Sequence, residues 1–159
     1  MSPILFAGTA LFLGFASGLR AFTPLALSCW IAAWGWMPLG GTRLGFLGTN
    51  IGALIVSVLA VGELIGDKLP MTPGRTTAGP LGARVVTGAL AGTALSIGAG
   101  QPWLIGLISG AAGSVAGAFA GFYARRFLVV RMGVRDIFVA IAEDLATIIL
   151  TLGVFAWAL

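Results

Sequence analysis

The chain has 159 residues, of which 58% are hydrophobic and only 9% are charged, and its mean hydropathy is +1.06. A soluble domain carries about a quarter charged residues, so this composition excludes a soluble globular protein. The net charge is +4, and with no histidine the chain lacks the most common metal ligand and acid–base shuttle.

The apolar segments predict an all-α, polytopic helical bundle in the membrane. A hydrocarbon core about 30 Å thick takes roughly 20 helical residues per span, so we expect five or six spans in one transmembrane domain, residues 1–159. The first segment lacks the basic start of a signal peptide, and we expect it to remain in the mature protein. The apolar segments are residues 3–19, 21–39, 44–66, 82–100, 103–124 and 136–158.

Arg20 is the only charged residue before Arg43 and interrupts the first apolar run, in the stretch GFASGLRAFTP. A single helix over residues 3–39 would be about 55 Å long, nearly twice the thickness of the hydrocarbon core. Gly18 and Pro24 favour a turn at this point. A partial repeat, G-x-R-x-x-T at residues 18–23 and 82–87, places Arg20 and Arg84 alike at cytoplasmic helix starts. We predict six short spans with both termini outside; five spans plus a re-entrant segment around Arg20 is the alternative.

The polar breaks between the apolar segments indicate the orientation. Breaks 67–80 and 125–136 share one side, and the positive-inside rule places them in the cytoplasm. Tryptophans near the opposite side predict an interfacial belt there. The basic residues of the two breaks are Lys68, Arg75, Arg125, Arg126, Arg131 and Arg135, and the tryptophans are Trp30, Trp34, Trp36, Trp103 and Trp157.

Glycines at helical spacing predict close helix packing. Small residues let membrane helices approach backbone to backbone, within one copy or between copies. Because the chain is small for an internal path, we expect a homo-oligomer joined through glycine faces. The longest such face is formed by Gly106, Gly110, Gly113, Gly117 and Gly121.

The ionisable residues gather toward the predicted cytoplasmic side, and intramembrane charges usually pair or mark function. One interpretation is that Arg20 and Arg84 form buried ion pairs that only fix packing. The other is a cytoplasm-facing pocket in which the arginines bind a small anionic or phosphate-bearing solute. The candidate ligand-binding residues are Arg20, Thr23, Glu63, Asp67, Lys68, Arg75, Arg84, Glu143 and Asp144.

A small permease or channel-like protein is our leading functional prediction, with an enzyme less favoured. One alternative is an intramembrane lipid-phosphate enzyme, in which the carboxylates hold a divalent metal; the other is a structural, lipid-organising subunit. The loop at residues 66–84 carries basic residues that would contact anionic lipid headgroups. We expect no cofactor and no nucleic-acid partner, and we name no catalytic residue.

Five motifs together resemble a family of small glycine-rich bacterial inner-membrane proteins that is classified as a domain of unknown function. The resemblance covers nearly the whole chain and implies a multi-pass, all-helical protein of the bacterial inner membrane, without implying an activity. The motifs are SGLRAFTPLAL, GELIGDKLP, GPLGARVVTGALAG, GAFAGFYARR and AEDL.

Overall fold

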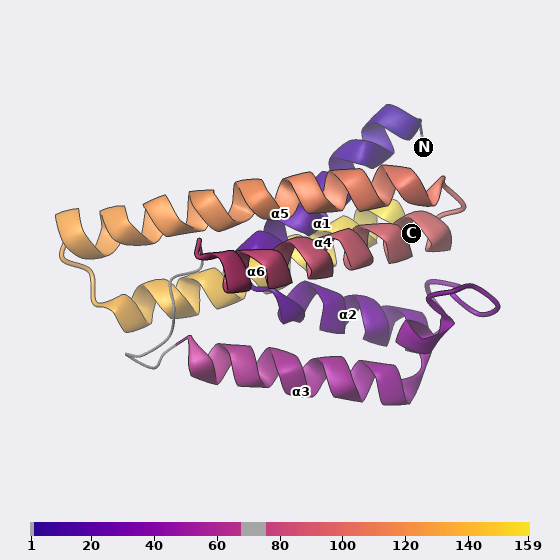
Figure 1. The fold of residues 1–159 in the computed structure, drawn as a ribbon, viewed down its shortest axis with the longest axis horizontal. Coiled ribbons are helices and arrows are strands. Elements are labelled where there is room, and N and C mark those ends of the chain that lie inside the picture. Colours follow the sequence, from indigo (N-terminus) through magenta and orange to yellow (C-terminus); the bar gives the residue numbers. More distant parts are fainter. Residues whose placement is uncertain (1, 68–75) are drawn as a thin grey trace.

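The computed structural model describes residues 2–67 and 76–159, and in these ranges every regular element is helical. Consecutive α-helices run in opposite directions, so both termini lie at one end of the bundle, on the right in Figure 1. We call this the terminal end; the polar end holds the start of α4 and the α5–α6 connection. The elements are α1 (Pro3–Leu19), α2 (Phe22–Ala33), the 3-10 turn η1 (Gly45–Gly48), α3 (Asn50–Gly66), α4 (Ala78–Gly98), α5 (Trp103–Arg126), the π-turn η2 (Phe127–Arg131) and α6 (Asp136–Ala158).

The first apolar run folds back at Arg20, as predicted. Pro24 explains the position of the break, because its ring would clash with the carbonyl of residue 20 in a continuous helix. Arg20 accordingly has extended backbone angles, and Pro24 lies in the first turn of α2, where no amide donor is needed. At its start, α1 is capped by Ser2, and Pro3 opens the helix.

The position of this turn differs from the prediction, because Arg20 lies in the interior of the bundle. The α1–α2 turn stops well short of the polar end that α5 and α6 reach (Figure 1). With 12 residues, α2 is about 18 Å long, too short to cross a core of about 30 Å. The α1–α2 hairpin therefore folds back at Arg20, as the six-span prediction expects. Its arginine is buried, as the re-entrant alternative expects.

Among the described residues, three helices are long and apolar enough to cross a membrane: α4, the continuous helix Trp103–Arg131, and α6. The other apolar helices, α1, α2 and α3, have 17, 12 and 17 residues. Large apolar side chains such as Val58 and Ile149 are exposed on the outer faces, as expected for lipid contact. These features are those of a membrane protein.

Two element boundaries differ from the predicted segments for local reasons. The fourth helix begins at Ala78, so Arg84 lies in its second turn instead of at its start. The fifth helix continues past residue 124, and its last turn widens into η2 before the chain turns at Gly133, which has a positive φ angle.

A glycine seam joins α1, α4 and α5. A Cβ atom added at Gly110 would overlap the carbonyl of Gly88, and one at Gly117 would overlap the carbonyl of Phe15. The glycines of the predicted face are all buried, and the first four of them lie against α4 or α1: Gly106, Gly110, Gly113, Gly117 and Gly121. The face is filled within one chain, so it is not available to a second copy; the oligomer stays a prediction and needs another surface.

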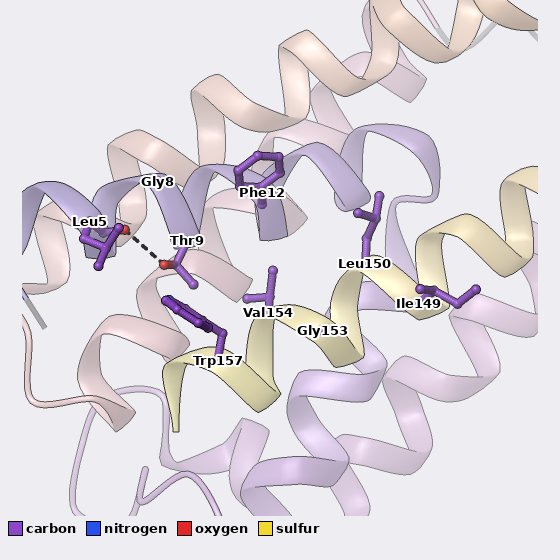
Figure 2. A pocket seen from close by; sticks show the side chains of 9 residues that line it. All are labelled: Leu5, Gly8, Thr9, Phe12, Ile149, Leu150, Gly153, Val154 and Trp157. Carbon is purple, nitrogen blue, oxygen red and sulfur yellow. Dashed lines mark hydrogen bonds between the residues drawn. The ribbon is translucent and has the colours of Figure 1, made fainter.

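An apolar groove runs between α1 and α6 on the outside of the bundle (Figure 2). It has a volume of about 510 Å³ and is lined by side chains such as Phe12, Val154 and Trp157. Gly8 and Gly153 widen it, because neither has a Cβ atom. A groove of this chemistry is suited to lipid acyl chains.

Candidate functional site

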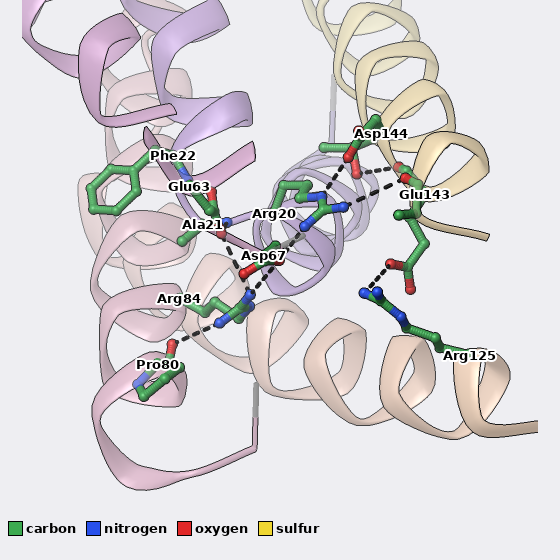
Figure 3. A network of polar contacts seen from close by, with 12 residues as sticks. Arg20, Ala21, Phe22, Glu63, Asp67, Pro80, Arg84, Arg125, Glu143 and Asp144 are labelled. Atoms are coloured by element: carbon green, nitrogen blue, oxygen red, sulfur yellow. Dashed lines mark hydrogen bonds and ion pairs between the residues drawn. The ribbon is translucent and has the colours of Figure 1, made fainter. Parts of the chain in front are cut away.

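Arg20 has the largest fully buried side chain among the described residues, with 0% of it exposed. Its Nε donates to Oδ1 of Asp144 at 2.6 Å, and its Nη1 pairs with Asp67. The remaining nitrogen, Nη2, donates to the carbonyl of Ala140 at 3.5 Å. Asp67, which follows α3, and Asp144 of α6 therefore contact the turn between α1 and α2 on opposite sides of one guanidinium (Figure 3).

Glu63 caps the start of α2, which has no capping side chain of its own. Its two carboxylate oxygens accept hydrogen bonds from the amides of Ala21 and Phe22, at 2.7 and 2.9 Å. Amides at a helix start carry partial positive charge and have no partner within the helix, so the carboxylate stabilises this end.

Arg84 plays the opposite role at the end of α1. Its Nε donates to the carbonyl of Gly18 at 3.1 Å, and its Nη1 donates to the carbonyl of Pro80 at the same distance. A cation at a helix C-terminus matches the partial negative charge there. The Nη2 of Arg84 also lies 3.4 Å from Oε1 of Glu63, which connects the two caps.

Asp67 lies between the two buried arginines. Its Oδ2 pairs with Nη1 of Arg20 and lies 3.8 Å from Nη2 of Arg84. It follows the last residue of α3, and 17% of its side chain is exposed. Beside it is a cavity of about 260 Å³, lined by Glu63, Asp67 and Arg84 together with apolar residues of α2, α3 and α4. The carboxylate of Asp67 thus contacts both guanidiniums at the edge of this cavity.

A second ion-pair group lies nearer to the polar end. Arg125 binds both carboxylate oxygens of Asp136, with distances of 2.7 and 2.6 Å. Its Nη1 lies 3.6 Å from Oε2 of Glu143. Because Glu143 precedes Asp144 on α6, the two groups are adjacent along that helix (Figure 3).

The predicted residues are only partly brought together. Arg20, Glu63, Asp67, Arg84 and Asp144 form one connected network, whereas Glu143 pairs with Arg125. The hydroxyl of Thr23 is buried, and no hydrogen-bond partner for it is found in the described part of the chain. Lys68 and Arg75 lie outside the described residues.

Sequence reasoning missed the backbone groups that complete the network. The amides of Ala21 and Phe22 and the carbonyls of Gly18 and Ala140 are among the partners. A signal for the first two was present, because the start of α2 has no Ser, Thr, Asp or Asn to cap it. Arg125 served only to predict the orientation of the chain, although its ion-pair partner Asp136 follows it across the α5–α6 connection.

The arrangement of the carboxylates bears on the metal alternative. In the ranges 2–67 and 76–159, no group of three or more acidic or cysteine side chains could hold a metal ion. The carboxylates that the enzyme hypothesis requires each lie against an arginine. The geometry favours ion pairing between side chains at this site.

Comparison with known proteins assigns the family but no activity. The chain belongs to the family described as a domain of unknown function (DUF4126), which it matches over residues 7–159. No curated protein matches the chain. No solved structure matches it either.

Proposed function

We propose that this member of the DUF4126 family is a small permease, working as an oligomer in a bacterial inner membrane, that binds an anionic or phosphate-bearing solute. The observation that carries the proposal is the double contact of Asp67 with Arg20 and Arg84 beside the cavity. The polar end, which holds Arg125, Arg126, Arg131 and Arg135, would face the cytoplasm by the positive-inside rule.

In this proposal the carboxylate of Asp67 pairs with the arginines when no solute is bound. Guanidinium groups bind carboxylate and phosphate through the same parallel hydrogen bonds, so a solute anion would compete with Asp67 for both arginines. Asp67 stands at the end of α3 and is partly exposed, so it can leave the arginines without breaking a helix.

A one-for-one exchange would conserve the charge of the network. Two arginines, Arg20 and Arg84, face three carboxylates in the connected network. A singly charged anion that replaces Asp67 leaves the charge around the arginines unchanged. Glu63 and Asp144 remain in place and hold the two guanidiniums in position during the exchange.

Asp67→Asn is the informative variant, because asparagine keeps the size and an acceptor oxygen but removes the competing charge. We expect it to raise the affinity for inorganic phosphate about tenfold, equivalent to about 1.4 kcal/mol. The measurement is the stabilisation of the purified protein against heat by phosphate, relative to chloride at equal ionic strength. Asp136→Asn, which removes a carboxylate outside the network, is the matched control and should leave the affinity unchanged.

Transport is tested in proteoliposomes with radiolabelled inorganic phosphate and glycerol phosphate as probes. Arg20→Gln and Arg84→Gln should abolish uptake, with circular dichroism checking that the helices persist. Unchanged uptake in both variants, or a lower phosphate affinity in Asp67→Asn, would contradict the proposal.

A structural role is the second candidate, because Glu63 and Arg84 cap the two helix ends at the α1–α2 turn. If the network only locks this hairpin, Asp67→Asn lowers the melting temperature and neither phosphate nor glycerol phosphate stabilises any variant. The two candidates therefore give opposite results in the same titration.

A further inference from the structure

A second pocket lies on the outer surface of the bundle, where α5 passes into η2. It has a volume of about 500 Å³ and is lined by Tyr123, Arg126, Phe127, Val130 and Arg131. All five side chains are exposed. The side chains of both arginines therefore face outward, at the end of a helix that is long enough to cross a membrane.

The π-turn explains why the two arginines share a pocket. In an α-helix, residues five apart point in directions about 140° apart, because each residue adds about 100°. In η2 the ring closes from residue i to i+5, as in the bond from the amide of Met132 to the carbonyl of Phe127 at 3.3 Å. The wider turn brings Arg131 back toward the face of Arg126, so that both line one pocket.

The charge on this pocket is not balanced by the chain's own acids. The chain has five acidic residues, and each lies against Arg20, Arg84 or Arg125. Within the described residues no ion pair involves Arg126 or Arg131. Two guanidiniums are therefore available to an external anion.

We propose that this pocket binds the phosphate of an anionic phospholipid. Paired arginines favour phosphate through bidentate hydrogen bonds, and the aromatic ring of Tyr123 suits the headgroup region. Phe127 and Val130 are apolar and exposed beside the arginines, so they offer acyl-chain contact that a free phosphate ion cannot use. The site is separate from the Arg20 network and does not depend on the proposed transport.

The test measures retention of phosphatidylglycerol relative to phosphatidylcholine on the purified full-length protein, by native mass spectrometry from mixed micelles. In the double variant Arg126→Gln, Arg131→Gln, we expect the preference for phosphatidylglycerol to fall at least tenfold. Arg135→Gln is the matched control: this exposed arginine stacks on the ring of Phe138 outside the pocket, and its loss should change little.

A charge-conserving variant separates a built site from general surface charge. Arg126→Lys, Arg131→Lys should lose part of the preference, because lysine keeps the charge without the planar fork. An unchanged preference in this variant, or an equal fall in Arg135→Gln, would overturn the proposal. Displacement of the lipid by millimolar inorganic phosphate would also overturn it, since the site would then recognise the free ion.

Discussion

At the scale of single residues, Arg20 shows why a charge can lie in the middle of an apolar run. The three nitrogens of its guanidinium donate in different directions, to Asp144, to Asp67 and to the carbonyl of Ala140. A buried charge is tolerated only when its partners are complete, and loss of one partner typically costs about 3–5 kcal/mol. The planar fork of arginine meets this requirement, whereas the point charge of lysine does not.

Replacement of Arg20 by lysine should therefore destabilise the protein although the charge is kept. We expect a loss of about 3 kcal/mol, which corresponds to a fall of roughly 6–12 °C in melting temperature for a chain of this size. The measurement is thermal unfolding in detergent, followed by circular dichroism. Arg43→Lys, at an exposed position, is the control; equal melting temperatures for the two variants would contradict the assignment.

The sequence located the charged cluster but not its pairing. All the acids fall near one side of the alternating segments, so their proximity to Arg20 and Arg84 followed from topology alone. The partners depend on helix rotation and depth, which a hydropathy pattern does not specify. Asp144 and Glu143 are adjacent in sequence, yet they point to Arg20 and Arg125 respectively because neighbouring residues on a helix face different directions.

At the scale of helices, the seam between α1, α4 and α5 depends on glycine at a few positions. The backbones of α4 and α5 come close enough at Gly88 and Gly110 that a methyl group on either would meet the other helix. In membranes such close packing and the backbone contacts that it permits drive helix association.

Gly110→Ala should separate two of these helices and lower the melting temperature. Gly62→Ala is a matched control, because it also lies within a helix but nothing lies within 4 Å of its added methyl group. In a helix interior alanine is favoured over glycine by up to about 1 kcal/mol, so the control should be neutral or slightly stabilised. The comparison is made by thermal unfolding; a fall of equal size in both variants would show that the seam is not specific.

The spacing of the glycines predicted a packed face, but it could not identify the neighbouring helix. A face of small residues looks the same in sequence whether its partner belongs to the same chain or to another copy. The observed partners are α4 and α1, and they are set by the antiparallel order of the bundle. The depth of the α1–α2 turn was equally hidden, because Pro24 determines where a helix breaks but not how far into the membrane it lies.

At the scale of the whole molecule, the two ends of the bundle carry different kinds of side chain. The terminal end carries exposed Trp34, Trp36, Trp103 and Trp157, and the polar end carries the arginines that follow α5. An aromatic belt at one interface and a basic rim at the other is the pattern of an oriented membrane protein.

This orientation predicts the labelling of single cysteines, after the buried native Cys29 is replaced by serine. Ser2→Cys and Leu159→Cys should react with a membrane-impermeant maleimide in intact spheroplasts, because both lie at the terminal end. Gly133→Cys, in the α5–α6 connection, should react only after the membrane is opened. Labelling of residues 2 and 159 from opposite sides would contradict the alternating order of the helices.

The ion pair between Arg20 and Asp144 also has a consequence for how the protein is made. Its two halves are 124 residues apart in the chain. At typical synthesis rates of about 5–20 residues per second, roughly 6–25 seconds separate their emergence from the ribosome. During most of that interval Arg20 of the first hairpin can pair with Asp67, but its second acidic partner, Asp144, does not yet exist. The nascent hairpin should therefore stay near the water-filled insertion machinery or the membrane surface until α6 arrives, and translation stopped before residue 144 should leave a product that the cell degrades.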